Sequence, residues 1–359
     1  LDLWNLRARD GYIQSGKVRF EDISEADLAP KKTKNDEKEG LTTPQRQWMQ
    51  VTKALNGDSS YFIDRDNLRK EMETWKFPLH FIDFETATPA IPFNRGLKPY
   101  EGIAFQFSHH IVHENGLIEH AGEFLNTEPG VFPNFGFIRA FKRELENDAG
   151  RVFRYAAHEN SYVNQIFRQL SESTVEIPDR LELMEFIKTI STSTGDQAEK
   201  WKGERDMIDL LELVKRFYYD PVMRGSNSIK YVLPAILNSS ERLRLKYSEP
   251  VYGAADGIKS LNFNDWKWVQ FENGAVKDPY KLLPKMFADV SEDDLEAFAE
   301  DEIRDGGAAM TAYTRLQFED LTDYQRTEIR GALLKYCELD TMAMVLIYEG
   351  WLDLINKGN

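Results

Sequence analysis

The chain has 359 residues, of which 42% are hydrophobic, which predicts one large domain or two with a sizeable core. No apolar run reaches the ~18 to 20 residues of a membrane helix. One cysteine, Cys337, excludes an intrachain disulfide and multi-cysteine zinc or iron–sulfur sites, so the expected setting is the reducing cytoplasm. The formal charge of −15 argues against wrapping a long duplex, but it is compatible with a nucleic-acid enzyme that has an acidic metal site.

Residues 1–75 are expected to form a small helical appendage. The stretch 30–40 is charged and has no aliphatic residue, which is typical of a linker or an exposed loop. A helix is predicted to begin at its N-cap, Thr43, and to end at Gly57, and another is predicted over 67–75. A fragment or processed product of a longer protein is one explanation for a sequence that begins with leucine.

From residue 76 the pattern changes to strands. A first strand is predicted over 79–86, and two further strands over 102–125 are joined by the hairpin signal at 114–116. The elements predicted after this hairpin are a helix over 134–147, a strand over 151–158, a helix over 159–171, a helix with a short strand at its start over 206–219, a helix over 226–237 that ends at Pro234 or shortly after it, and a last helix over 323–355.

The order of these elements predicts the α/β class. A three-strand meander followed by alternating helices and strands forms a mixed sheet with helices on its faces. We expect this domain to span residues 76–359 and to contain an acidic insertion around 240–322. Within it, residues 286–305 include nine acids and one base. This run predicts a solvated helix face, although a cover for the active site or a partner surface is also open.

Two carboxylates, Asp83 and Glu85, lie inside the first predicted strand. Alternate residues of a strand share a face, so both side chains point the same way from a run that is otherwise apolar. Two like charges that are partly desolvated need a compensating cation, and carboxylate oxygens suit Mg²⁺ or Mn²⁺. The structural alternative is that the strand ends here and that the acids are hydrated.

A further acid, Asp340, is predicted to be buried in the last helix. Apolar residues surround this helix from Ala332 to Ile347, so a carboxylate inside it needs a partner. Tyr336 lies one turn earlier on the same face. A phenol beside a carboxylate suits a metal-bound water that the phenol orients. A structural hydrogen bond between these two side chains is the alternative.

The remaining acid, Glu159, is expected where the strand over 151–158 passes into a helix. This position is at the C-terminal edge of the sheet, where α/β proteins collect their functional residues. A favourable interaction of an acid with the helix dipole is the alternative explanation.

Together these acids resemble the three motifs of the DEDD, or DnaQ-like, 3′–5′ exonucleases, which have an RNase H-like fold. The spacing Tyr336-x-x-x-Asp340 resembles the tyrosine-bearing branch of that superfamily. The run "DFET" resembles the first motif, with Ala87-Thr88 in place of the Thr-Gly that often follows. Glu159 stands where the middle motif usually has aspartate.

The chain also resembles, over about residues 76–350, a bacterial family of predicted nucleases described as a domain of unknown function. The runs that carry this resemblance are "DFETATPAIP", "FQFS", "GSNSIKYVLP" and "YCELDTMAM". Glutamate in the middle motif is usual in that family. Its longer members carry additional upstream sequence, some of it similar to a Cas4-type nuclease, so an upstream nuclease domain of the same protein is one expected partner.

The resemblance implies a metal-dependent 3′–5′ exonuclease that hydrolyses phosphodiester bonds at the 3′ ends of single-stranded DNA or RNA. It implies two bound Mg²⁺ or Mn²⁺ ions, a tyrosine that orients the attacking water, and contacts to the terminal nucleotide. The residues that would hold the metals are Asp83, Glu85, Glu159 and Asp340. Tyr336 would orient the water, and Thr86 would contact the terminal nucleotide.

The segment "RGSNSIKYVLP" is a candidate phosphate site. It offers Arg224, Ser226, Ser228 and Lys230 around the N-terminus of a predicted helix, where N–H groups and basic side chains favour anions. A serine-capped helix whose apolar residues fill the core is the alternative.

Two other functions are compatible with the sequence. One is a catalytically weak nucleic-acid-binding or scaffold module of a larger nuclease, which the glutamate at position 159 and the charge of −15 favour. The other is a phosphohydrolase that acts on small nucleotides.

Overall fold

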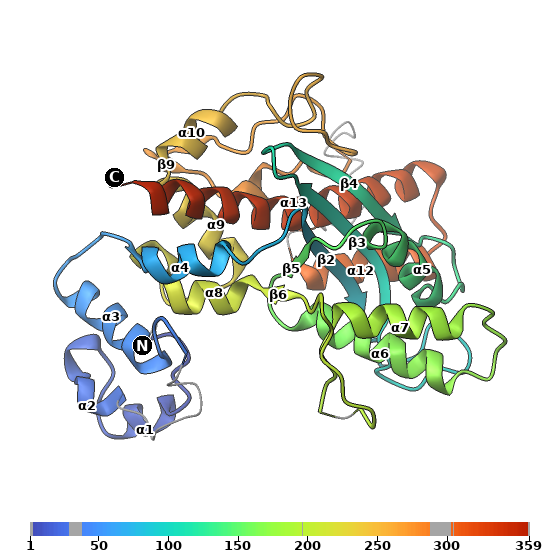
Figure 1. The fold of residues 1–359 in the computed structure, drawn as a ribbon, viewed down its shortest axis with the longest axis horizontal. Coiled ribbons are helices and arrows are strands. Elements are labelled where there is room, and N and C mark those ends of the chain that lie inside the picture. The colour runs from blue at the N-terminus through green and yellow to red at the C-terminus, as the bar shows by residue number, and fades with distance from the viewer. Residues whose placement is uncertain (1–2, 29–37, 196, 288–302, 304, 358–359) are drawn as a thin grey trace.

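The computed structural model describes residues 3–28, 38–195, 197–287, 303 and 305–357 (Figure 1). Most of the acidic stretch over 286–305 lies outside the described residues, so its predicted helix face stays a prediction. Among the described helices, none combines the length and the apolar character needed to cross a membrane.

A five-stranded sheet lies at the centre of the molecule, with the strand order β4-β3-β2-β5-β6. β2 runs antiparallel to β3, and β3 runs antiparallel to β4, whereas β2, β5 and β6 are parallel. The predicted meander, mixed sheet and α/β class are therefore confirmed. The strands are β2 (Leu79–Ala87), β3 (Ile103–Val112), β4 (Ile118–Leu125), β5 (Arg151–Arg154) and β6 (Ile208–Asp209).

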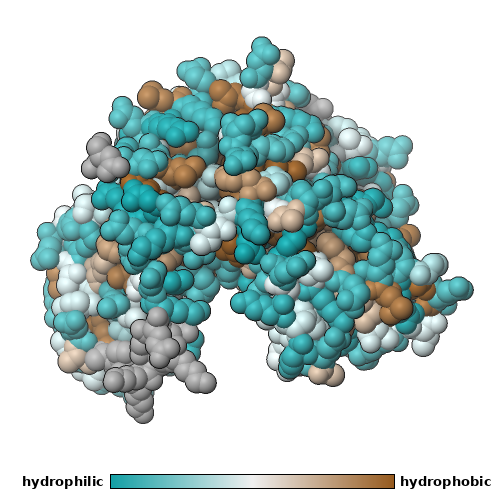
Figure 2. All heavy atoms as spheres, in the orientation of Figure 1, coloured by the Kyte–Doolittle hydropathy of each residue, from teal (hydrophilic) through white to brown (hydrophobic). Residues whose placement is uncertain are grey.

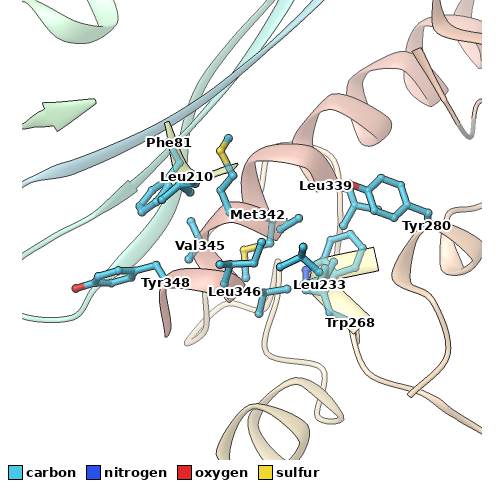
Figure 3. Packing of buried hydrophobic residues seen from close by; sticks show 14 of the residues in the cluster. Phe81, Leu210, Leu233, Trp268, Tyr280, Leu339, Met342, Val345, Leu346 and Tyr348 are labelled. Atoms are coloured by element: carbon cyan, nitrogen blue, oxygen red, sulfur yellow. The ribbon is translucent and has the colours of Figure 1, made fainter. Parts of the chain in front are cut away.

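The two faces of β2 pack against different helices, as period-two alternation requires. On one face, Phe84 makes edge-to-face contacts with Phe137 (4.8 Å between ring centres) and Phe141 (5.1 Å) of α5 (Asn134–Leu145). This face is also covered by α6 (His158–Glu172) and by α7 (Arg180–Ile190), a helix that the elements predicted above do not include. On the other face, Phe81 packs into the core beside α13 (Figure 3).

The last helix, α13 (Asp323–Asn356), crosses the sheet on the face to which Phe81 belongs. Every residue from Tyr336 to Trp351 is buried, as the apolar residues on all its sides predict. Its start at Thr322 has a capping box with Gln325. Figure 3 shows the packing that anchors it, and the labelled side chains are Phe81, Leu210, Leu233, Trp268, Tyr280, Leu339, Met342, Val345, Leu346 and Tyr348.

α9 (Ile229–Ser239) packs closely against α13. The helix predicted over 226–237 is observed at Ile229–Ser239, so it continues past Pro234 and ends two residues later than predicted. The residues on both sides of the proline are buried against the core. The approach is close at Gly350, where an added Cβ would lie 2.2 Å from Ile236 Cγ2. Glycine at this position therefore sets how near α9 lies to α13.

The N-terminal part of the chain contains α1 (Arg9–Gln14), α2 (Glu25–Leu28) and α3 (Thr43–Leu55). Thr42, one residue before the predicted N-cap, caps α3. A small separate core of Leu3, Ile23, Leu28 and Val51 holds these helices together.

Residues that follow α3 join the sheet domain directly. β1 (Phe62–Ile63) pairs with β7 (Tyr218–Tyr219), and Leu68 of α4 (Arg65–Met72) is buried in the main core. The other described elements are η1 (Phe20–Asp22), α8 (Leu210–Phe217), η2 (Pro221–Met223), α10 (Glu241–Tyr247), β8 (Phe271–Glu272), β9 (Ala275–Val276), η3 (Pro279–Leu282) and α12 (Gly306–Phe318).

Candidate metal centre

The structure brings the four predicted metal-binding carboxylates into one pocket of about 390 Å³. We call this pocket the acidic pocket. Its described lining residues are Asp83, Phe84, Glu85, Thr86, Tyr155, His158, Glu159, Ile229, Lys230, Gly306, Tyr336 and Asp340.

Three elements deliver these carboxylates. Asp83 and Glu85 lie on the face of β2 that is turned towards α13, two residues apart in a strand. Because β5 is parallel to β2, the helix that follows β5 starts at the same edge of the sheet, and Glu159 is its second residue. Asp340 comes from the buried middle of α13. The local patterns that predicted each acid therefore converge at one edge of the sheet.

The carboxylates in the acidic pocket disfavour one another's ionised form. Burial, followed by the charges of Asp340, Glu85 and Glu159, raises the pKa of Asp83 well above its usual value. Burial and the charge of Asp340 likewise raise the pKa of Glu85. Burial raises the pKa of Glu159 to about 8 and that of Asp340 to about 6. A divalent cation among these groups would remove this penalty.

Few protein groups compensate these charges. Glu159 is 1% exposed, and its Oε2 has no hydrogen-bond partner within the described part of the chain. Asp340 accepts a hydrogen bond from the Tyr280 hydroxyl through Oδ1. Against the effect of burial, this bond, the charge of Lys230 and hydrogen bonding from Tyr336 act to lower the pKa of Asp340. The buried Glu159 Oε2, which lacks a hydrogen-bond donor, is the kind of oxygen that a metal ion would bind.

The donor set fits a hard divalent cation. Carboxylate oxygens are the ligands that Mg²⁺ and Mn²⁺ prefer. A ligand atom from each of Asp83, Glu85 and Cys337 lies within 4.8 Å of the others. The Cys337 thiol is 3.7 Å from both Oδ2 and the main-chain oxygen of Asp83, and burial raises the pKa of this thiol, which disfavours the thiolate. The oxygens, rather than the sulfur, are therefore the candidate ligands.

The residues predicted to bind substrate fall into two groups. Thr86 lies in the acidic pocket, where its Oγ1 is 3.0 Å from His158 Nε2. Lys230 is also there, with its ammonium 5.0 Å from the ring centre of Tyr280 and 5.4 Å from that of Tyr336. The other three, Arg224, Ser226 and Ser228, line a neighbouring pocket. The structure thus separates residues that the sequence placed in one site.

Two polar residues that line the acidic pocket, Tyr155 and His158, and one that contacts it through Asp340, Tyr280, were not expected from the sequence. Tyr280 reaches Asp340 from a segment 60 positions earlier, and nothing in its local pattern indicates that contact. His158 precedes Glu159 directly, and this adjacency was an available signal. Tyr155 forms part of the wall, and its hydroxyl donates a 2.5 Å hydrogen bond to the main-chain oxygen of Asn227.

A second buried group of titratable side chains lies on the same face of the sheet. We call it the histidine cluster; its members are His110, His120, Tyr252 and Glu338. His110 bonds Tyr252 (2.8 Å) and Thr341 (2.7 Å). The carboxylate of Glu338 accepts from Tyr252 (2.5 Å) and Asn262 (2.8 Å) and lies 3.2 Å from His120 Nδ1.

The histidine cluster also meets a geometric criterion for metal binding, since ligand atoms of His120, Glu123 and Glu338 lie within 4.8 Å of one another. These atoms are already hydrogen-bonded to protein groups, however. Burial acts to raise the pKa of Glu338, but the hydrogen bond and charge of His120 and the hydroxyls of Ser260 and Tyr252 outweigh it, and the pKa lies below its usual value. The cluster is satisfied internally, in contrast to the acidic pocket.

Comparison with known proteins gives one match. A protein-family model described as "Domain of unknown function (DUF2779)" matches residues 80–228. No curated protein and no solved structure matches the chain. The matched stretch contains Asp83, Glu85 and Glu159, and it ends before Tyr336 and Asp340. The family description assigns no activity to these residues.

Proposed function

We propose that this protein is a metal-dependent nuclease that removes nucleotides from the 3′ end of single-stranded DNA or RNA. The observation that carries the proposal is the convergence of four carboxylates from β2, α6 and α13, three of them buried and Asp83 half-buried. One of the buried carboxylates, Glu159, has an oxygen without a hydrogen-bond partner among the described residues. Burial disfavours the ionised form of Glu159, although a backbone hydrogen bond and the charge of Arg154 act in the opposite direction, and a bound cation would stabilise this form.

The order of the motifs and of the strands supports the exonuclease rather than another metal enzyme. The strand order β4-β3-β2-β5-β6, with a meander followed by parallel strands, agrees with an RNase H-like sheet. The Asp-x-Glu pair lies on the central strand of that sheet, and the Tyr-x-x-x-Asp pair lies on the last helix. Both positions agree with the resemblance to the DnaQ-like exonucleases.

Under this proposal, Asp83, Glu85, Glu159 and Asp340 would hold two Mg²⁺ or Mn²⁺ ions. Bound there, the ions would supply a water of lowered pKa and stabilise the charge on the leaving 3′ oxygen. Burial and the neighbouring carboxylates raise the pKa of Tyr336 well above its ordinary value, so its hydroxyl stays protonated. It would therefore orient the attacking water as a hydrogen-bond partner and not act as a base.

Two further residues would contact the substrate. Lys230 offers a positive charge at the edge of the acidic pocket, where it would meet the phosphate that is cleaved. Thr86, held by its contact with His158, would contact the terminal nucleotide.

The test is hydrolysis of 3′- and 5′-labelled DNA and RNA oligonucleotides with Mg²⁺, Mn²⁺ or EDTA. We expect a ladder of one-nucleotide steps from the 3′ end, absent with EDTA. Asp83→Asn should lower the rate by at least about 10³-fold, because the lost metal contributes several kcal/mol to transition-state stabilisation. Glu119→Gln, a carboxylate paired with His113 outside the pocket, is the matched control and should keep full activity.

Three results would contradict the proposal. Hydrolysis that persists in Asp83→Asn would remove the acidic pocket from the reaction. Oligonucleotide binding without turnover would replace the exonuclease with a binding or scaffold module. Turnover of mononucleotides alone would replace it with a small-nucleotide phosphohydrolase.

A further inference from the structure

A second pocket, of about 670 Å³, adjoins the acidic pocket and shares Tyr155 and Ile229 with it. Figure 2 shows the molecule hollowed between the part formed by α1–α3 and the part formed by α6 and α7. The other described residues that line the second pocket are Leu3, Trp4, Asn5, Ala156, Leu211, Lys215, Arg224, Gly225, Ser226, Asn227 and Ser228.

The charge of the second pocket is opposite to that of the acidic pocket. Its described lining includes Lys215 and Arg224 and contains no carboxylate, although Lys215 is hydrogen-bonded to Glu212 (2.6 Å) outside it. The two pockets therefore place an acidic site and a basic site on either side of one shared wall.

A third cation, Arg46, is buried beside the second pocket and is bonded to one of its lining residues, Asn227. It is 2% exposed, and its guanidinium donates to the main-chain oxygens of Val214 (3.2 Å) and Tyr218 (2.5 Å) and to Asn227 Oδ1 (2.5 Å). Within the described chain, no carboxylate lies at ion-pairing distance from it. Burial lowers the pKa of Arg46 to about 10, so it remains charged at neutral pH. A buried cation without a carboxylate favours an anion in the adjoining pocket.

Unused hydrogen-bond donors point to the same kind of ligand. Asn227 is 6% exposed, and its Oδ1 is turned to Arg46, whereas its Nδ2 has no partner among the residues described. The next residue, Ser228, is the N-cap of α9, and its side chain makes no capping hydrogen bond. The first N–H groups of a helix lack partners inside the helix and favour anions. A lining residue of this pocket thus has an amide without a partner among the described residues, and the helix N-terminus beside it offers N–H groups.

We propose that the second pocket binds the sugar–phosphate backbone of a single strand and holds a phosphate 5′ to the one at the acidic pocket. This proposal rests on the proposed nuclease function and extends it to a substrate that must reach both pockets. α9 links the two sites, because Ser228 lines the second pocket and Lys230, two residues later, lines the acidic pocket. The substrate class is therefore an oligonucleotide rather than a mononucleotide.

The N-terminal segment completes this binding surface. Trp4 is fixed to α3 by two hydrogen bonds, from its N–H to Gln50 Oε1 (3.0 Å) and from Gln47 Nε2 to its carbonyl (2.7 Å). The guanidinium of Arg46 lies 5.6 Å from the centre of the Trp4 ring. The N-terminal helices thus hold the residues that form one side of the second pocket.

Binding of fluorescein-labelled oligothymidylates of two to twelve nucleotides tests the proposal. The anisotropy titrations use Asp83→Asn protein in EDTA, so that hydrolysis does not interfere. Adding Arg224→Ala to this background should weaken binding of the longer strands about tenfold and reduce the slope of log K against log salt by about one. Arg242→Ala, an exposed arginine on α10, is the matched control and should change neither quantity.

A neutral linkage identifies the phosphate. Replacing the second linkage from the 3′ end with a methylphosphonate should weaken binding to the Asp83→Asn background protein and abolish the difference between it and its Arg224→Ala derivative. Equal affinity of these two proteins for the unmodified strand would overturn the proposal. Arg224 is exposed, and its replacement should leave the urea midpoint unchanged, so a folding defect is distinguishable from lost binding.

The two proposals fail in different ways. Binding that depends on Arg224 without any hydrolysis by the unaltered chain would support the backbone site and reject the exonuclease. A 3′ ladder whose KM is the same in Arg224→Ala would reject the backbone site and support the exonuclease.

Discussion

Glu338 and Asp340 lie two residues apart on α13, and both are buried, yet they belong to groups of opposite character. Glu338 is in the histidine cluster, where its hydrogen bonds hold its pKa below the usual value. Asp340 is in the acidic pocket, where burial raises its pKa to about 6 despite the hydrogen bonds of Tyr280 and Tyr336. One helix therefore carries one acid whose ionised form its surroundings favour and one whose ionised form burial disfavours.

This difference separates a structural polar cluster from a candidate ligand site. In the histidine cluster, donors and acceptors are matched, so the cluster stabilises the fold as it stands. In the acidic pocket, the carboxylates raise one another's pKa, so the fold tolerates a cost that a bound cation would remove. Two clusters of titratable side chains on the same face of the sheet thus differ in whether they need a ligand from outside the protein.

The largest expected effect is on the free energy of unfolding. Its sign should differ between a substitution in the histidine cluster and one in the acidic pocket. Glu338→Ala should lower the free energy of unfolding by about 3–5 kcal/mol, because it leaves buried donors without an acceptor. Asp340→Asn should raise the stability of the metal-free protein, because it removes a repelling charge. Urea unfolding in EDTA measures both. Loss of stability in both variants would show that the acidic pocket is also satisfied internally.

The pH dependence should differ in sign as well. Glu159 has a folded pKa of about 8, above the ordinary 4.5, so its contribution to stability is full below pH 4.5 and is lost as the pH rises towards 8. Burial lowers the pKa of His110 well below 6.5, so its contribution is present above pH 6.5 and is lost as the pH falls. The midpoint temperature of unfolding, measured in EDTA from pH 4 to 9, should therefore be highest at an intermediate pH, above the range in which His110 is protonated and below the range in which Glu159 ionises.

Saturating Mn²⁺ and the variant Glu159→Gln check this assignment. Saturating Mn²⁺ should flatten the decline on the alkaline side, and Glu159→Gln should reduce it, because Asp83 and Glu85 also have raised pKa values. Neither change should alter the decline on the acidic side. An alkaline decline that persists in both experiments would contradict the role given to Glu159.

Tyr280→Phe should have a smaller effect, confined to the acidic pocket. It removes the hydroxyl that donates to Asp340 Oδ1, and loss of such a supporting hydrogen bond typically weakens metal binding by about 10–100-fold. Tyr313→Phe, whose ring stacks on Phe105 at 4.0 Å, is the control with the same chemical change. Calorimetric titration with Mn²⁺ compares them, and equal affinities would exclude Tyr280 as a support for the site.

The smallest effect is expected for an exposed pair. His113 and Glu119 lie 2.9 Å apart with 36% and 25% of their side chains exposed. Glu119→Gln should change the free energy of unfolding by less than about 1 kcal/mol, because solvent screens such pairs. A larger loss in urea unfolding would mean that this pair belongs with the buried network.

The features that could be predicted from the sequence are those with a local period. Alternation along β2 gave the shared face of Asp83 and Glu85, and the apolar residues on all sides of α13 predicted its burial. The helix α7 was also within reach, because Leu183, Ile187 and Ile190 repeat at helical spacing and are buried on one face. It was missed although its signal was present.

Other features could not be predicted because they arise only from packing. Tyr280 meets Asp340 across 60 positions of chain through a short 3₁₀ turn that has no period. Arg224 and Lys230 are close in sequence, but the start of α9 lies between them and directs them into different pockets. The role of Trp4 depends on α3, which lies some 40 positions later, and no local pattern connects them.

Gly350 links the packing of the hydrophobic core to the two pockets, because it contacts α9. The place of α9 depends on how closely Ile236 approaches this glycine, whereas the opposite end of the same helix carries Ser228 and Lys230. An alanine at position 350 would require Ile236, or the helix that carries it, to shift. A shift of α9 would alter both pockets, because its N-terminal end lines both. Such a substitution in the hydrophobic interior would then change the geometry of both pockets, although every residue that lines them is intact.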